Sequence, residues 1–167
     1  LMDHPGPLRE QMHRLREAGY RAVKMGWGPF GRVSHALDEV IVRTAREALG
    51  PDIDLMVDAG ASDAYWPNGY AWALRTSKML VDYDVVWFEE ALRPDALDDF
   101  VALRRNSSVP ISGGEVLTRR QTFVPWLAAG AFDIVQPDVC KVGGISEERR
   151  IAWYAEEFGV KMIPHGW

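Results

Sequence analysis

The sequence predicts an α/β fold in which parallel strands and helices alternate and form a (β/α)-barrel. Six short apolar runs alternate with longer stretches of helical periodicity, an order typical of a parallel sheet. No two alternating runs are joined by a tight turn, so nothing indicates a β-hairpin. A polar residue ends each run, which favours a barrel over a doubly wound sheet, because the carboxyl ends of barrel strands meet on one rim.

The predicted strands are short and rich in apolar or β-branched residues, as expected for strands buried on both faces of a parallel sheet. They cover residues 21–25, 54–58, 84–90, 109–115, 132–138 and 161–165. The glycine-rich patterns that mark nucleotide-binding sheets are absent from the chain, so a doubly wound sheet has no supporting motif.

The predicted helices carry apolar residues at three- and four-residue spacing, as helices with one face on a sheet do. Leu8, Met12 and Leu15 form such a face in the first of them. The six expected helices cover residues 8–18, 37–48, 71–80, 97–103, 118–128 and 146–158. Gly159 follows the last one at the position where a glycine commonly ends a helix.

The composition is that of an ordinary globular protein and argues against several functional classes. Hydrophobic residues make up 47% of the 167 residues, and the net charge of −5 argues against a surface for nucleic acid or anionic membrane. The sequence shows no transmembrane stretch and no signal-peptide pattern, and a cytoplasmic protein is expected. The single cysteine, Cys140, excludes an internal disulfide framework and is expected to be a small buried residue.

The polar residues that end the six runs are the candidate functional residues. In chain order they are Lys24, Asp58, Glu89 with its neighbour Glu90, Glu115, Asp138 and His165. Each follows the previous one by about the length of one strand–helix unit. Because parallel strands point the same way, a barrel would gather these side chains on one rim, where barrel active sites lie.

Three of these carboxylates form a candidate metal site. Asp58, Glu89 and Glu115 would lie on adjacent strand ends, where they would repel one another and be costly to bury. A hard divalent cation removes this repulsion, and carboxylate oxygens with room for water and substrate suit Mg²⁺ better than softer metals. The sequence therefore predicts a Mg²⁺ site at the rim.

The next two strand ends predict an acid–base dyad of Asp138 and His165. An aspartate that is hydrogen-bonded to one imidazole nitrogen selects the tautomer and raises the basicity of the other nitrogen. Such a histidine can remove a proton from carbon if a metal stabilises the resulting enediolate.

Taken together, the strand-end motifs resemble the mandelate racemase/muconate lactonizing enzyme-like branch of the enolase superfamily, and its acid-sugar dehydratases in particular. The motifs are LMVDAG, WFEEAL, ISGGE, VQPDVCKVGG and MIPHGW. The resemblance runs from about residue 20 to the last residue. It implies a TIM-like barrel of the modified (β/α)7β type, incomplete, with roughly strands 2 to 7 present.

The resemblance also implies roles for the strand-end residues. Asp58, Glu89 and Glu115 correspond to the ligands of Mg²⁺ in this family. His165 and Asp138 correspond to its general acid/base dyad. Glu90 resembles the second acid of its strand motif, which implies that it supports the metal ligands without contacting the metal.

One departure from the family pattern shapes the expected chemistry. The second strand of the family often carries Lys-x-Lys with the second lysine as a base, whereas this chain has Lys24-Met25-Gly26. Gly26 offers no base, so a two-base racemase is disfavoured. His165 is instead expected to remove a proton and then, as imidazolium, to protonate a leaving hydroxyl. Lys24 remains available to neutralise the substrate carboxylate or to contact a hydroxyl.

The expected activity is dehydration of an acid sugar, a lyase reaction that passes through an enediolate. A racemase, epimerase or cycloisomerase of the same superfamily is one alternative, and a non-catalytic barrel fragment that serves only in folding or assembly is another. The expected partner is a small carboxylate, with no nucleic acid or membrane and a homo-oligomer in the full-length protein. Trp27 and Trp167 are expected to wall the substrate pocket, and Lys141 is expected to be a loop charge.

The resemblance further predicts the domain organisation. Members of the family carry an N-terminal capping domain followed by a complete barrel, so residues 1–167 are expected to be a partial C-terminal catalytic barrel domain. The capping domain and the first and eighth strands are expected to be absent from this sequence. Because it does not start with Met, it is expected to begin inside a longer natural chain.

Overall fold

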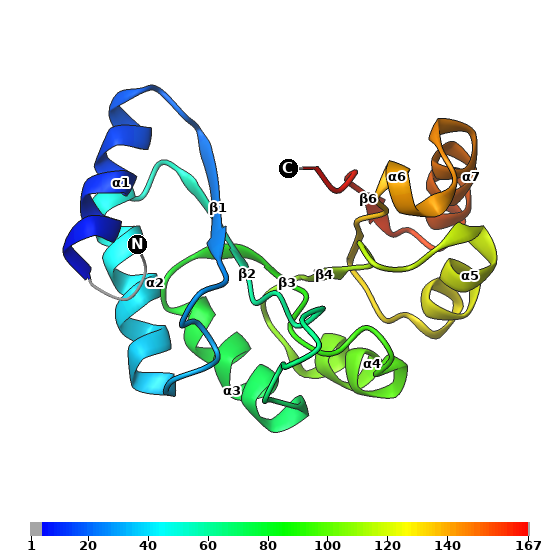
Figure 1. Cartoon of the computed structure of the whole chain (residues 1–167), viewed down its shortest axis with the longest axis horizontal. Helices are drawn as coiled ribbons and strands as arrows, with labels where there is room; N and C mark the ends of the chain where they lie inside the picture. The colour runs from blue at the N-terminus through cyan, green and yellow to red at the C-terminus, as the bar shows by residue number, and fades with distance from the viewer. Residues whose placement is uncertain (1–4, 167) are drawn as a thin grey trace.

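The structure is a computed structural model that describes residues 5–166, and its strands form one open parallel sheet (Figure 1). The strands pair in the order β1-β2-β3-β4-β5-β6, which is their order in the chain. They are β1 Ala22–Gly26, β2 Asp54–Asp58, β3 Val85–Glu89, β4 Ile111–Gly113, β5 Ile134–Val135 and β6 Lys161–Met162. Neighbouring strands are parallel throughout.

The helices lie on the outer side of the arc that the strands follow (Figure 1). They are α1 Pro5–Glu17, α2 His35–Leu49, α3 Tyr70–Val81, α4 Leu97–Asn106, α5 Arg119–Ala129, α6 Val139–Val142 and α7 Ile145–Glu157. Within the described residues, β1 and β6 form the two unpaired edges of the sheet. The arrangement is therefore an incomplete barrel, which confirms the predicted fold class.

The predicted elements are found in their expected places, with one addition. Each expected strand overlaps an observed one, with β1 shifted by one residue toward the C-terminus, and β5 and β6 are short, with two residues each. All six expected helices extend by a residue or more at one or both ends, and Gly159 follows α7 in the left-handed region with a φ of 65°. The additional helix is α6, a single turn that begins directly after Asp138.

Local sequence explains why α2 begins and ends where it does. Ser34 has extended backbone angles, and its hydroxyl accepts a hydrogen bond from the Leu37 N–H at 3.2 Å, which satisfies one of the unpaired amides of the first turn. The helix ends at Gly50, which adopts a positive φ of 78°. Its buried face, which includes Ile41 and Ala45, recurs at four-residue spacing and packs on α1 and the sheet.

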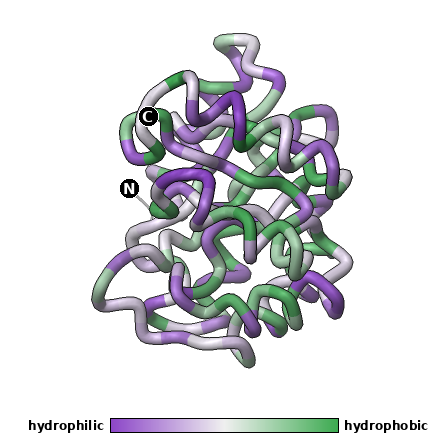
Figure 2. Tube along the Cα trace, turned by 90° about the vertical axis from the view of Figure 1, so that its right-hand side faces the viewer, coloured by the Kyte–Doolittle hydropathy of each residue, from purple (hydrophilic) through white to green (hydrophobic). Residues whose placement is uncertain are grey.

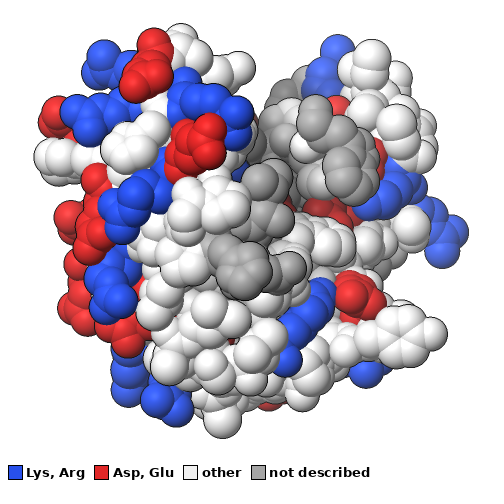
Figure 3. Space-filling model, turned by 60° about the vertical axis from the view of Figure 1, so that its left-hand side comes forward, with Lys and Arg blue, Asp and Glu red and all other residues white. Residues whose placement is uncertain are grey.

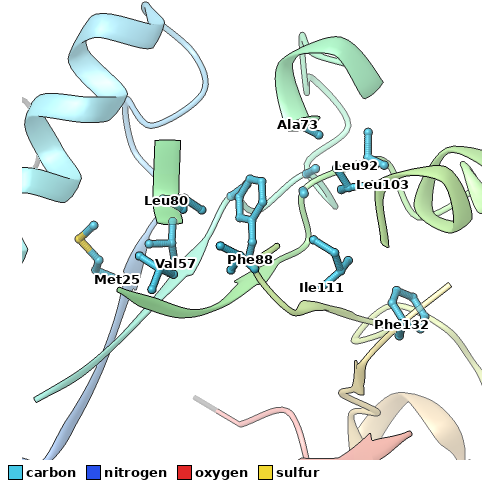
Figure 4. Packing of buried hydrophobic residues seen from close by; sticks show 14 of the residues in the cluster. Met25, Val57, Ala73, Leu80, Phe88, Leu92, Leu103, Ile111 and Phe132 are labelled. Atoms are coloured by element: carbon cyan, nitrogen blue, oxygen red, sulfur yellow. The ribbon is translucent and has the colours of Figure 1, made fainter. Parts of the chain in front are cut away.

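The core lies between the sheet and the helices. Figure 4 shows side chains of β2, β3 and β4, among them Val57 and Phe88, in one layer with side chains of α3 and α4. Phe88 has 0% exposure, and burial of a side chain of this size contributes about 1.5–3 kcal/mol. In Figure 2, hydrophobic and hydrophilic residues alternate along the helical parts of the chain, as expected for helices with one buried face.

A second group of aromatic rings packs under the C-terminal half of the sheet. Trp126 and Phe132 stack at 5.3 Å between ring centroids, and Phe100 meets both rings edge-on. Such pairs contribute beyond the area that they bury. This cluster joins α4 and α5 to the segment that leads into β5.

The surface of the molecule carries mixed charges. On the face shown in Figure 3, lysine and arginine side chains are interspersed with aspartate and glutamate side chains. Among the described residues, no helix is long and apolar enough to cross a membrane.

Candidate active site

Three buried carboxylates meet at the carboxyl ends of neighbouring strands. Asp58 ends β2 and Glu89 ends β3, and the two are direct partners in the strand register. Glu115 lies just beyond β4, after a turn in which Gly114 has a φ of 110°. One ligand oxygen from each residue lies within 4.8 Å of the others. The predicted rim arrangement of these three residues is thus present, and an all-oxygen set of this kind suits Mg²⁺.

Each carboxylate of this triad accepts a hydrogen bond from an electrically neutral donor. The Gly60 N–H donates to Asp58 Oδ1 at 2.8 Å, and the Ser62 hydroxyl donates to Glu115 Oε1 at 3.2 Å. The Trp87 indole N–H donates to Glu89 Oε2 at 2.9 Å. None of these three donors was singled out from the sequence, because glycine, serine and tryptophan at such positions carry no motif of their own.

The triad is electrostatically costly without a cation. Burial, together with the neighbouring charge of Glu89, raises the pKa of Asp58 to about 6, against the opposing effect of Lys24. Two carboxylates that share a buried site cannot both hold their charge cheaply. A divalent cation bound among the three oxygens would remove this penalty.

Lys24 lies inside the triad rather than apart from it. Its ammonium nitrogen is 2.5 Å from Glu89 Oε1 and 3.5 Å from Asp58 Oδ2. Burial lowers the pKa of Lys24, but the two carboxylates outweigh this effect and raise the pKa above its ordinary value. The side chain therefore stays cationic at neutral pH and neutralises part of the negative charge of the triad.

His165 lies between the triad and Asp138. Its Nε2 is 3.0 Å from Glu115 Oε2, and its Nδ1 is 3.3 Å from Asp138 Oδ2. The backbone N–H of His165 donates to the Pro137 carbonyl at 2.9 Å, which holds the segment after β6 beside the end of β5. The two residues of the predicted dyad are thus brought together, and the histidine reaches a candidate metal ligand with its other nitrogen.

Asp138 is held as an anion by its surroundings. Its Oδ1 accepts a hydrogen bond from the Cys140 N–H at 2.8 Å, and Lys141 Nζ is 3.2 Å from its Oδ2. Burial raises the pKa of Asp138, but Cys140 N–H, Lys141 and His165 together hold it below its usual range. An anionic carboxylate that faces an imidazole nitrogen, as Asp138 Oδ2 faces His165 Nδ1, can orient the ring by accepting a hydrogen bond from it.

Two expectations for this segment were wrong, and helix α6 is the reason for both. Lys141 is not a loop charge, because α6 turns its side chain toward Asp138 and the cavity described below. Cys140, in the same turn, is exposed rather than buried. The sequence did carry a signal for this turn: Asp138 is a favourable N-cap residue, and Gly143 follows at its end.

Glu90 lies behind the triad in an apolar environment. It is 2% exposed, and burial raises its pKa to about 8. Its Oε1 accepts a hydrogen bond from the Gly114 N–H at 2.8 Å, whereas its Oε2 has no partner among the described residues. The side chain is therefore protonated at neutral pH, and its contact with Gly114 supports the turn that presents Glu115.

A cavity of about 530 Å³ opens beside these residues. Its lining includes Lys24, Asp58, Glu115, Lys141 and His165, together with Trp27. Trp27 has a left-handed backbone with a φ of 65° and is 41% exposed, and its ring lies over Gly60, where an added Cβ would be 2.7 Å from the ring. The other expected wall residue, Trp167, lies outside the described residues.

Gly26 occupies a position that has no room for a side chain. A Cβ at this position would lie 1.7 Å from the backbone oxygen of Asp58. The close approach of β1 and β2 at this point allows the Trp27 N–H to donate to the same oxygen at 3.1 Å. A side chain at position 26 is therefore excluded by the backbone as well as by the sequence.

Comparison with known proteins identifies the family of this chain. Residues 7–167 match the family described as enolase C-terminal domain-like, and the chain belongs to this family. It is 36% identical over 168 residues to D-galactarolactone cycloisomerase of Agrobacterium fabrum. The aligned region covers 99% of this chain and 42% of the relative. The chain thus spans less than half the length of this curated relative.

Solved structures agree with this assignment. The 3,6-anhydro-D-galactonate cycloisomerase from Zobellia galactanivorans superimposes with a TM-score of 0.88 at 31% identity, over 98% of this chain and 44% of that chain. The L-talarate dehydratase from Polaromonas sp. JS666, a structure in complex with Mg and L-glucarate, gives a TM-score of 0.86 at 29% identity, over 96% and 44% of the two chains. The similar proteins of this superfamily therefore include both acid-sugar dehydratases and cycloisomerases.

Proposed function

We propose that this chain carries the catalytic residues of a Mg²⁺-dependent enzyme that removes the proton α to a carboxylate and eliminates water from an acid sugar. The observation that carries the proposal is the buried triad of Asp58, Glu89 and Glu115 beside the His165–Asp138 pair. Metal ligands and a histidine base at one cavity are the two parts that this reaction needs.

The triad is the proposed Mg²⁺ site. Its ligand oxygens converge within 4.8 Å, and the L-talarate dehydratase of similar fold was crystallised with Mg and L-glucarate. When bound, the cation would stabilise the negative charge that develops on the substrate carboxylate as the α-proton leaves. Lys24 is proposed to neutralise the same carboxylate, since it remains cationic and lines the cavity.

His165 is proposed to act as both base and acid. Its Nε2 accepts the α-proton, and Asp138 stabilises the imidazolium that results. The bond between carbon β and its hydroxyl oxygen then breaks, and the imidazolium returns the proton to this oxygen, so that water leaves. The remaining enol becomes a 2-keto acid by tautomerisation, and the histidine is again neutral.

The glycine at position 26, where a second base would lie, supports elimination over racemisation. A two-base racemase needs a proton donor on the face of the substrate opposite His165, and a side chain at Gly26 would collide with the Asp58 backbone. A one-base site can still perform an elimination, because the same histidine serves the proton that leaves and the oxygen that departs.

A cycloisomerase is the second candidate, and the similarity to D-galactarolactone cycloisomerase favours it. For a cyclic acid, the same proton abstraction would expel the ring oxygen from carbon β instead of a hydroxyl. The product would then keep all atoms of the substrate. The described residues fit either leaving group, since both reactions need one base, one acid and a metal-stabilised carboxylate.

The remainder of a full-length protein is proposed to complete the pocket. Since the chain spans 42% of the curated cycloisomerase, an N-terminal capping domain and the missing strands would enclose the cavity beside Trp27. A homo-oligomer is proposed for that full-length protein.

The test is proton exchange in a full-length protein that contains this chain. With L-glucarate or D-galactarolactone in deuterated water, we expect incorporation of deuterium at the α carbon and loss of activity by a factor of about 10²–10⁴ in His165→Ala. Mg²⁺ affinity should be retained in this variant. Exchange at the wild-type rate in His165→Ala would remove His165 from the role of base. A product lighter by one water indicates a dehydratase, and a product of unchanged mass indicates a cycloisomerase.

A further inference from the structure

Trp87 lies next to Glu89, one of the candidate metal ligands, on strand β3. It precedes Glu89 by two residues on β3, and residues two apart on a strand point to the same side. Its indole N–H donates to Glu89 Oε2 at 2.9 Å, a normal hydrogen-bond length. Glu89 is only 1% exposed, so bulk water does not orient its carboxylate and protein donors must do so.

The two donors to Glu89 differ in charge. Lys24 contacts Oε1 with a cationic ammonium group, whereas Trp87 contacts Oε2 with a neutral N–H. A divalent cation that approaches Glu89 is repelled by the ammonium group but not by the indole. A carboxylate oxygen has two lone-pair directions, so an oxygen that accepts from Trp87 can still coordinate a metal. The indole contact is therefore compatible with a bound cation, and the ammonium contact competes with it.

We infer that Trp87 is a positioning residue that holds the Glu89 carboxylate in the orientation needed to bind the metal. The inference rests on the proposed Mg²⁺ site. It also accounts for a regularity of the triad, in which each ligand accepts a hydrogen bond from a neutral donor: Asp58 from Gly60, Glu89 from Trp87 and Glu115 from Ser62. Outer partners of this kind tune metal affinity by about 10–100-fold.

The experiment compares Mg²⁺ affinity in matched variants by calorimetry on the 167-residue chain. Trp87→Phe keeps an aromatic ring but removes the N–H, and we expect affinity to fall by about tenfold or more. Lys24→Met removes the competing charge from the same carboxylate, and we expect equal or tighter binding. Trp153→Phe is the control, because Trp153 lies on α7, is 55% exposed and contacts Arg149 instead of the triad.

A variant with unchanged shape separates positioning from packing. Replacing Trp87 by benzothienylalanine, which has sulfur in place of the indole N–H, keeps the ring size and should lower Mg²⁺ affinity as Trp87→Phe does. In nuclear magnetic resonance spectra, the indole N–H signal that is missing from Trp87→Phe should shift when Mg²⁺ is added to the wild type. Thermal unfolding in EDTA identifies any variant that has simply lost its fold. The Mg²⁺ affinity of the folded benzothienylalanine variant then decides between positioning and packing.

The outcomes separate the inference from the proposed function. Weaker binding in both Trp87 variants, with Trp153→Phe unchanged, supports the inference. Wild-type affinity in the folded isosteric variant overturns it and leaves the Mg²⁺ site standing. If the folded wild-type chain binds no Mg²⁺ at all, the proposed site in this chain fails, and the role of Trp87 fails with it.

Discussion

Replacing Gly26 by alanine places a methyl group against the backbone of β2. The added Cβ would lie 1.7 Å from the Asp58 carbonyl oxygen and 2.6 Å from its carbonyl carbon. Both contacts are with backbone, so neither can be relieved by rotation of a side chain. The contact must open beyond 3.0 Å, the distance below which something has to shift, and β1 must move away from β2 at this end.

The structure indicates what this movement disrupts. It stretches the bond from the Trp27 N–H to the Asp58 oxygen, now 3.1 Å, and leaves a buried carbonyl without its partner at about 1–3 kcal/mol. Overpacking of a close contact adds about 1–3 kcal/mol. We therefore expect Gly26→Ala to lower the free energy of unfolding by about 2–6 kcal/mol, a large part of the stability of an ordinary domain. Because Asp58 is a candidate metal ligand, Mg²⁺ affinity should fall as well.

Urea unfolding followed by far-ultraviolet circular dichroism measures the first effect, and Mg²⁺ calorimetry measures the second. Gly69→Ala is the matched control, because Gly69 has nothing within 4 Å of an added Cβ and an extended backbone; we expect a change within about 1 kcal/mol. The steric reasoning is refuted if Gly26→Ala unfolds within about 1 kcal/mol of Gly69→Ala and binds Mg²⁺ normally.

Three further predictions concern the metal site, a buried acid and the core. In the double variant Asp58→Asn, Glu89→Gln, the roughly 1:1 binding of Mg²⁺ expected for the wild type should vanish in calorimetry, because two anionic ligands become neutral amides. For Glu90, burial raises the folded pKa from 4.5 to about 8, so the folded chain holds a proton that the unfolded chain has released. The free energy of unfolding should therefore fall as pH rises from about 4.5 to about 8, and Glu90→Gln should remove a few kcal/mol of this slope in urea unfolding with EDTA. Phe100→Ala should lower the free energy of unfolding by about 3–5 kcal/mol, because Phe100 is 1% exposed and packs on Trp126 and Phe132.

Each of these predictions has a contrary result. Full Mg²⁺ binding by the double variant would place the metal elsewhere. An unchanged pH slope in Glu90→Gln would mean that the Glu90 carboxyl is ionised in the folded chain at neutral pH. A loss below about 1 kcal/mol in Phe100→Ala would mean that the aromatic cluster closes around the gap.

Much of the fold and the candidate site could be predicted from local pattern alone. Strand ends such as Asp58 and Glu89 are marked by a change from apolar to polar residues, and helix faces such as that of α2 are marked by three- and four-residue spacing. Parallel strands with helices between them have few arrangements, so the order of the strands and the rim position of their last residues followed from the order of the elements.

Pairings across the site depend on distances that no local pattern encodes. The sequence placed Lys24 at the rim, but only the register of β1, β2 and β3 brings its ammonium group within 2.5 Å of Glu89. The role of Lys141 was missed because one turn of helix, which turns its side chain to Asp138, is too short to show a periodicity. Trp87 lies in the motif WFEEAL, but nothing in the sequence marks it as a partner of Glu89.

The difference between what the sequence determines and what only the tertiary structure decides has a physical cause. Hydrophobic periodicity and turn residues act over a few positions along the chain. They therefore determine which segments become strands and helices without reference to residues far away in the sequence. Hydrogen bonds and ion pairs act over about 3 Å, so their partners are decided only when strands far apart in the chain are brought into register. The Gly26 approach to Asp58 and the Trp87 contact with Glu89 belong to this second kind, and they bear directly on the proposed metal chemistry.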